Sequence, residues 1–145
     1  NKIQFYVDRD VELRRDVSSG DAKVSEGVIK FENGRYVQII LLKKGTPGVC
    51  TVVNKNSLEI NFEMGDGKKL TFGITGVASP QEAYRIFASQ WINQDNGSRI
   101  GEIKYDNQTY YIQPGGEDAR LEIKKSVINK NKVDKKTMKG VKLKS

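Results

Sequence analysis

The stretch LEINFEMGDGKKLTFGI, residues 58–74, decides the fold class. Apolar and polar residues alternate in its first half, and they alternate again after the turn pair Asp66-Gly67. Successive side chains of a strand point to opposite faces, so the pattern predicts two strands, each with one buried and one solvated face. Asp-Gly between two such runs favours a hairpin. The residues expected to face the core are Leu58, Ile60, Phe62, Met64, Leu70, Phe72 and Ile74.

The same period of two runs through the N-terminal segment. Between Ile3 and Val17 the apolar side chains fall on odd positions and share one face. The sequence DRD at residues 8–10 is expected to bend this segment or to split it into two strands. Further along, Asn33-Gly34 predicts a hairpin turn, because both residues tolerate the positive φ of a type I′ turn.

A second hairpin is expected at residues 36–53. The sequence GTPG at 45–48 predicts a type II turn with Pro47 and Gly48 at its centre. Both arms are apolar on both faces, and a strand with one solvated face does not have this pattern. We therefore expect the second face to be covered by a helix, by the C-terminal segment or by another subunit.

One α-helix is predicted at residues 79–92, within SPQEAYRIFASQWI. Ser79 is a suitable N-cap, Pro80 suits the first helical position, and Glu82 completes a capping box. Four apolar residues then recur at the spacing i, i+3, i+4 and i+7, which predicts one apolar stripe. They are Tyr84, Phe87, Ala88 and Trp91.

Three more segments, 99–105, 109–113 and 119–125, have the features of strands and are separated by short turns. The chain is therefore predicted to be mainly β, with an antiparallel meander of about eight to ten strands forming a barrel or a two-sheet sandwich. One inserted helix completes a single domain that spans residues 1–145. This architecture is loosely similar to that of lipocalin-like barrels, without any motif of theirs, so the similarity implies a fold and no function.

Composition limits the chemistry of the protein. The chain has no histidine and a single cysteine, Cys50, so His-based triads, disulfides within the chain and multi-cysteine metal sites are all absent. We expect no enzymatic activity, no cofactor and no metal. No apolar run reaches the roughly 18–20 residues of a membrane-spanning helix. Because the chain starts at Asn1, a removed secretion signal is one interpretation, and we expect an extracytoplasmic (periplasmic or cell-envelope) location, with a cytoplasmic one left open.

The basic excess lies at the C-terminus. The formal net charge is +7, and the last 22 residues hold nine lysines and one acid, Asp134, so the rest of the chain is nearly neutral. This segment lacks arginine and aromatic residues, so nucleic acid is not an expected partner. Val141 and Leu143 alternate with lysines. We expect the lysine-rich segment 127–145 to end in a strand that pairs with the N-terminal strand.

Four residues are candidate ligand contacts. Arg15 lies on the otherwise apolar face of the first segment, where it could bind a carboxylate or phosphate; a position at a solvated rim is the alternative. Tyr84, Phe87 and Trp91 could control entry to an interior cavity, or they could seal the core.

These features favour a non-enzymatic β-barrel-like module that holds a small apolar or amphipathic ligand or docks a protein partner. The alternative is binding of a polyanion through the lysine-rich C-terminal segment. A hollow interior would favour the ligand, whereas a packed interior would favour recognition at the surface.

Overall fold

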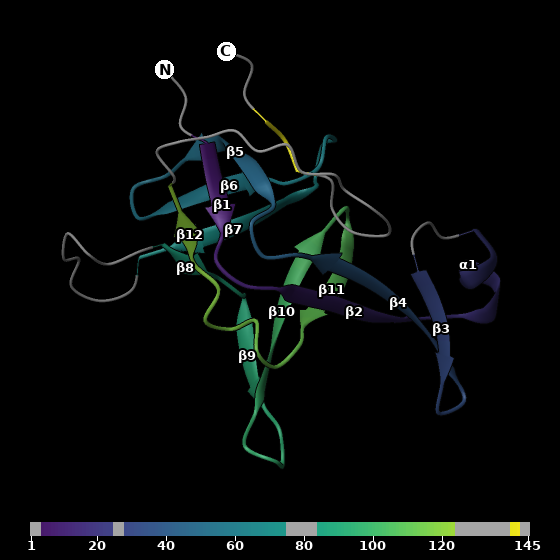
Figure 1. Ribbon diagram of the computed structural model, residues 1–145. Helices are drawn as coiled ribbons and strands as arrows, with labels where there is room; N and C mark the ends of the chain where they lie inside the picture. Colours follow the sequence, from purple (N-terminus) through teal and green to yellow (C-terminus); the bar gives the residue numbers. More distant parts are fainter. Residues whose placement is uncertain (1–3, 25–27, 75–83, 124–139, 143–145) are drawn as a thin grey trace.

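The computed structural model describes residues 4–24, 28–74, 84–123 and 140–142. These residues form two antiparallel sheets and one short helix (Figure 1). The elements are β1 (Gln4–Val7), β2 (Val11–Val17), α1 (Ser19–Val24), β3 (Val28–Glu32), β4 (Arg35–Leu42), β5 (Pro47–Val53), β6 (Ser57–Asn61), β7 (Lys69–Gly73), β8 (Arg85–Ile86), β9 (Gln90–Asn93), β10 (Arg99–Tyr105), β11 (Gln108–Ile112) and β12 (Leu121–Glu122). The predicted mainly β, antiparallel fold is therefore confirmed.

The first sheet curls into a barrel. Its six strands follow the order β12-β1-β5-β6-β7-β8, and a bridge between Arg85 and Arg120 joins its two ends. Two backbone hydrogen bonds support this closure: Ile86 N donates to Ala119 O at 2.8 Å, and Leu121 N donates to Tyr84 O at 3.0 Å. When a sheet closes on itself, the backbone N–H and C=O groups along its edge strands gain hydrogen-bond partners.

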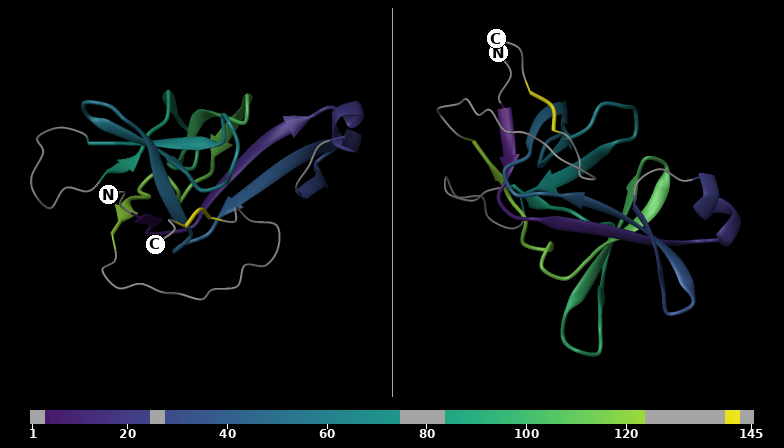
Figure 2. Two further views of the ribbon diagram at one scale, coloured as in Figure 1. Left: turned by 90° about the horizontal axis from the view of Figure 1, so that it is seen from above. Right: turned by 45° about the vertical axis from the view of Figure 1, so that its right-hand side comes forward.

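The second sheet stays open. Its order is β3-β4-β2-β11-β10-β9, so within the described residues β3 and β9 are its edges. Strand β2 pairs with β4 along its whole length, from Val11–Leu42 to Val17–Tyr36. Together with β3 these strands form an arm that projects away from the barrel (Figures 1 and 2). The predicted split of the first segment is confirmed, because β1 belongs to the barrel and β2 to this open sheet.

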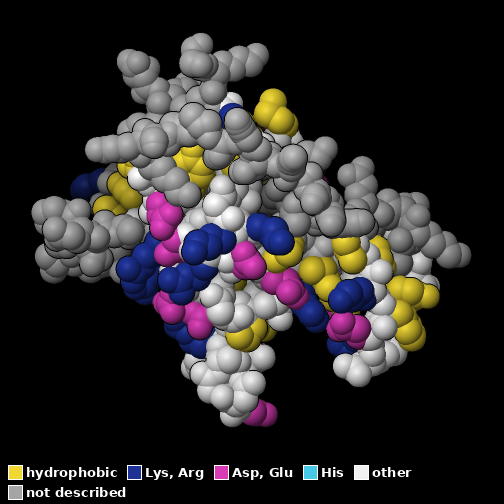
Figure 3. Space-filling model, viewed as in Figure 1, with side chains coloured by type: hydrophobic (Ala, Val, Ile, Leu, Met, Phe, Trp, Pro, Cys, Tyr) yellow, Lys and Arg dark blue, Asp and Glu magenta, His cyan; other side chains and the backbone are white. Residues whose placement is uncertain are grey.

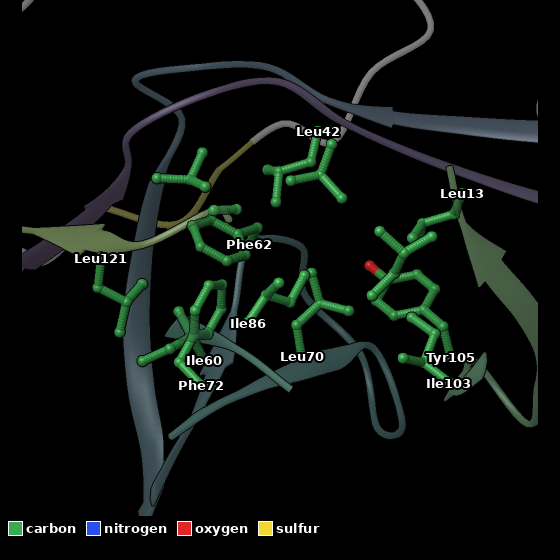
Figure 4. Close-up of a cluster of buried hydrophobic side chains, with 14 of the residues drawn as sticks. Leu13, Leu42, Ile60, Phe62, Leu70, Phe72, Ile86, Ile103, Tyr105 and Leu121 are labelled. Carbon is green, nitrogen blue, oxygen red and sulfur yellow. The ribbon is translucent and has the colours of Figure 1, made fainter. Parts of the chain in front are cut away.

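The interior of the barrel is filled by side chains (Figure 4). The rings of Phe62 and Phe72 meet edge-on with centroids 6.2 Å apart, and Ile60 is fully buried beside them. Burial of each such side chain contributes about 1.5–3 kcal/mol. The other members of the core are Phe5, Val7, Val11, Leu13, Leu42, Leu58, Leu70, Ile86, Ala88, Ile103, Tyr105, Tyr110, Ile112, Ala119 and Leu121.

The stretch that decides the fold behaves largely as predicted. Five of its apolar residues are buried, whereas Met64 is 79% exposed because β6 ends at Asn61 and the chain turns away before residue 64. The turn Asn33-Gly34 is also confirmed: φ is 49° at Asn33 and 79° at Gly34. The five buried residues are Leu58, Ile60, Phe62, Leu70 and Phe72.

The predicted helix at 79–92 is wrong for residues 84–92, and residues 79–83 lie outside the described part of the chain. Strands β8 and β9 occupy this region instead. The sequence also carries a period of two here, with Ile86 and Ala88 buried and Phe87 exposed between them. Pairing of β8 with β7 and of β9 with β10 outweighs the helical spacing.

The predicted hairpin at 36–53 is also wrong, because β4 and β5 belong to different sheets. The turn between them lies three residues earlier than predicted, with Thr46 N donating to Lys43 O at 3.1 Å and Gly45 at a φ of +84°. Pro47 and Gly48 belong to β5. A Cβ at residue 48 would lie 2.7 Å from the side chains of Ile60 and Phe62, so glycine there lets the barrel interior close.

The C-terminal segment docks on the barrel without forming a strand in residues 140–142. Gly140 N donates to Phe62 O at 2.6 Å, and Val141 N donates to Pro47 O at 2.8 Å. The predicted pairing with the N-terminal strand is wrong for these residues, because β1 already has β12 and β5 as neighbours. From β1, the Gln4 side chain contacts this segment, with its Nε2 donating to Val141 O at 2.7 Å. The remaining residues of the segment 127–145 lie outside the described part.

Candidate functional site

The candidate site lies where β2 and β11 diverge. Within the described residues these strands pair only at Leu13–Ile112 and Arg14–Tyr111. Gln113 N donates to Glu12 O at 2.9 Å, so the backbone of Glu12 faces β11. Hydrogen-bonding residues alternate along an antiparallel strand, so the next bonded pair would be Asp16 and Thr109. The strands are not paired at these two residues. The alternation therefore directs the backbone N–H and C=O groups of both residues toward the opening.

A groove of about 690 Å³ occupies this opening. It lies between the β3–β4 hairpin and the β10–β11 pair, and the space-filling view shows a notch at this side of the molecule (Figure 3). We call it the divergence groove. It is lined by Arg14, Arg15, Asp16, Glu32, Asn33, Arg35, Val37, Ile100, Thr109, Tyr111 and Gln113.

Most of the charged side chains of the divergence groove take part in ion pairs. Arg14 bridges two carboxylates, donating to Glu12 and, at 3.2 Å, to Glu32 on the neighbouring hairpin. Arg35 donates to Asp16 at 2.9 Å, and both of these side chains are mostly exposed. An exposed pair contributes little to stability, so it can exchange its partners for those of a bound molecule at low cost.

Arg15 connects the groove to the core. Its Nε donates to Gln38 Oε1 at 2.7 Å, and its guanidinium carbon lies 5.7 Å from the centroid of the buried Tyr110 ring. Arg15 belongs to the opposite face of β2 from Arg14 and Asp16, yet it lines the same groove. The half-buried arginine agrees with the rim interpretation, and its role as a ligand contact stays a prediction.

From Arg15, a series of side-chain contacts leads through Tyr110 and Tyr105 to Glu63. The Tyr110 ring meets the Tyr105 ring edge-on at 6.2 Å, and the Tyr105 hydroxyl donates to Glu63 Oε1 at 2.5 Å. Burial raises the pKa of Tyr105 far above its usual range, and the Glu63 carboxylate raises it further. Burial also raises the pKa of Tyr110, whereas Arg15 opposes this shift. Both phenols are therefore held in their neutral form at neutral pH.

The three predicted aromatic contacts are not brought together with Arg15, because none of them lines the divergence groove. Tyr84 is half-buried where the barrel closes, and Phe87 is 54% exposed in the link between β8 and β9. Trp91 packs on the core from β9, with the guanidinium carbon of Arg99 5.0 Å from its ring centroid. Ligand contacts by these three residues stay predictions.

Phe87 has a small groove of its own, of about 200 Å³, at the boundary of the two sheets. Lys69 and Lys104 flank it, and Leu70 and Ile103 contribute apolar surface. Elsewhere, Cys50 is half-buried, and burial raises the pKa of its thiol, which disfavours the reactive thiolate. Within the described residues, no three side chains of His, Cys, Asp or Glu gather in a way that could hold a metal ion.

Sequence reasoning did not single out Asp16, Glu32, Arg35 or Tyr111. The sequence carries a partial signal for the pairing of Glu32 with Arg35, because the Asn33-Gly34 turn sets these two residues opposite each other. The long-range contacts of Arg14 with Glu32 and Tyr111 depend on strand order, which the alternation of single residues does not encode. Among the described residues, no helix is long and apolar enough to cross a membrane.

Comparisons with known proteins transfer no function to this chain. No protein-family model matches it, and no curated protein and no solved structure shows significant similarity to it. The functional argument therefore depends on the residues of the site alone.

Proposed function

We propose that the protein is a non-enzymatic interaction module that docks a polypeptide partner in the divergence groove. The observation that carries this proposal is the separation of β2 from β11, which leaves the backbone groups of Asp16 and Thr109 facing a groove of about 690 Å³. An extended peptide can hydrogen-bond to such groups in the way that a strand is added to a sheet.

The side chains of the groove suit a polypeptide. Arginine and tyrosine are enriched among the residues that dominate binding energy at protein interfaces, and the groove presents Arg35 and Tyr111. Val37 and Ile100 add apolar surface beside them. The exposed pair of Arg35 with Asp16 can open to meet an acidic or an amide group of the partner.

A peptide in the groove is favoured over a small apolar ligand inside the barrel. Phe62, Phe72 and Ile60 occupy the barrel interior, and each is at most 1% exposed. The divergence groove, in contrast, is open to solvent, and most of its lining residues are polar or charged. This arrangement supports recognition at the surface.

The test uses a random-sequence peptide library displayed on phage and selected against the immobilised protein. Peptides that are enriched should bind the purified wild-type chain, and Tyr111→Ala or Arg35→Ala should weaken that binding about tenfold or more, as loss of an interface anchor does. Lys55→Ala is the matched control, because Lys55 is exposed in the β5–β6 turn and lies outside the groove. Its affinity should equal that of the wild type.

Two outcomes would contradict the proposal: no peptide is enriched, or the enriched peptides bind all variants equally while thermal unfolding shows that every variant is folded. A parallel thermal-shift screen with fatty acids, sterols and haem-like compounds addresses the small-ligand alternative. If one of these compounds stabilises the wild type and both groove variants equally, its binding site is in the interior or elsewhere on the surface, and not in the groove.

A further inference from the structure

Strand β3 has the properties of an unpaired sheet edge. It pairs with β4 on one side, and within the described residues it has no strand on its other side. In Figure 1 it lies in the projecting arm, away from the barrel. Natural proteins usually protect such an edge, because its free backbone groups can pair with another strand.

The register of the β3–β4 hairpin shows which backbone groups point outward. A two-residue turn is closed by a hydrogen-bonded pair, here Glu32 with Arg35. Hydrogen-bonded pairs alternate, so Lys30 also bonds to β4, whereas Ile29 and Phe31 direct their N–H and C=O groups away from it. The two residues with outward backbone groups are both apolar.

The side chain of Phe31 is unusually exposed for an aromatic residue in a strand. It is 64% exposed and contacts the chain through the Tyr36 ring, with centroids 4.9 Å apart and planes tilted by 59°. A large aromatic ring beside outward-facing backbone groups forms an apolar surface that another strand would cover.

We propose that this edge pairs with the same edge of a second copy of the chain, antiparallel, with Phe31 opposite Phe31. In this register Lys30 of each copy lies opposite Glu32 of the other, so the charges are complementary. A register shifted by one residue would set Lys30 opposite Lys30, and like charges directly opposite each other are destabilising. The two-fold axis passes between the two Phe31 residues, as an isologous dimer requires.

The pairing joins two apolar surfaces. Phe31 and Tyr36 of one copy meet Phe31 and Tyr36 of the other on one face of the combined sheet, while the Lys30–Glu32 pairs lie on the opposite face. Glu32 already accepts from Arg14 at 3.2 Å and keeps a second oxygen for the lysine of the partner copy. The proposal does not depend on the groove and its peptide.

The experiment is sedimentation velocity of the wild-type chain over a concentration series. The wild type should shift from monomer to dimer, and Phe31→Glu should remain monomeric at concentrations where the wild type is dimeric. Ile29→Pro is the second variant, since it removes an outward donor and leaves the hydrogen bonds to β4 in place. Circular dichroism checks that each variant keeps its fold, and Lys55→Glu is the control for an exposed charge change.

The charge pattern gives an independent readout. Lys30→Glu should weaken the dimer about tenfold or more, and the double variant Lys30→Glu, Glu32→Lys should recover part of the loss, because it restores opposite charges across the axis. A chain that stays monomeric over the whole series overturns the proposal. A dimer that survives both Phe31→Glu and Ile29→Pro overturns it as well, and places the interface elsewhere. If Phe31→Glu fails to fold, Ile29→Pro and the charge variants decide the question.

Discussion

Replacing Tyr105 by phenylalanine should lower stability by an amount that depends on pH. Tyr105 is 1% exposed, and its hydroxyl donates to the Glu63 carboxylate. Phenylalanine keeps the ring contact with Tyr110 and removes this hydrogen bond to a charged acceptor. The free energy of unfolding at neutral pH should therefore fall by about 1.5–3 kcal/mol.

At alkaline pH the difference between wild type and variant should shrink. The pKa of Tyr105 is raised in the folded state, so above about pH 10 the phenol ionises in the unfolded chain first. The unfolded state then binds fewer protons than the folded state, and wild-type stability falls as pH rises. One such group costs the wild type about 1.4 kcal/mol by pH 11. The variant lacks the phenol and avoids this loss.

Urea unfolding of both chains at several pH values between neutral and pH 11 measures the effect. Ile60→Val is the control, because it lowers stability by about 0.5–1.5 kcal/mol without removing a titratable group. Its difference from the wild type should stay constant with pH. A Tyr105→Phe difference that also stays constant would refute the reasoning, since it would mean that the phenol ionises equally easily in both states.

Two further predictions concern packing. Gly101→Ala should lower the free energy of unfolding by about 1–3 kcal/mol, because the added Cβ would lie 2.5 Å from the Trp91 ring. Gly20→Ala is the control and should not destabilise the protein, because nothing lies within 4 Å of the added Cβ. Urea unfolding measures both variants. Deleting residues 140–145 should cost about 1–3 kcal/mol through the backbone hydrogen bonds of Gly140 and Val141 to the barrel, whereas unchanged stability would show that this contact is not formed in solution.

The sequence predicted strands best where one face is buried and the turn is local. Leu58, Ile60 and Phe62 show this, because their alternation requires no knowledge of the partner strand. Asn33-Gly34 likewise determines its own turn. The existence of a β-rich fold could therefore be read from single segments.

The prediction failed where a partner distant in the sequence decides the local structure. Residues 84–92 satisfy both a helical and a strand spacing, and pairing with β7 and β10 selects the strand. The turn after β4 looks like a hairpin turn, but Gly45 N donates to Val7 O at 2.8 Å and the chain passes into the other sheet. Local residues cannot distinguish a hairpin from a corner between two sheets.

The candidate site escaped prediction for the same reason, and its position follows from the architecture. The barrel is nearly closed, so its strands pair mostly with one another and its apolar side chains fill the interior. Strand β2 lies in the open sheet, where it pairs with β4 along its whole length and with β11 at two positions only. Within the described residues, the backbone groups without a neighbouring strand therefore lie in the open sheet, at the β2–β11 divergence and along the outer edge of β3. Because backbone pairing is the main recognition chemistry that such groups offer, both proposed contacts of this protein involve extended polypeptide.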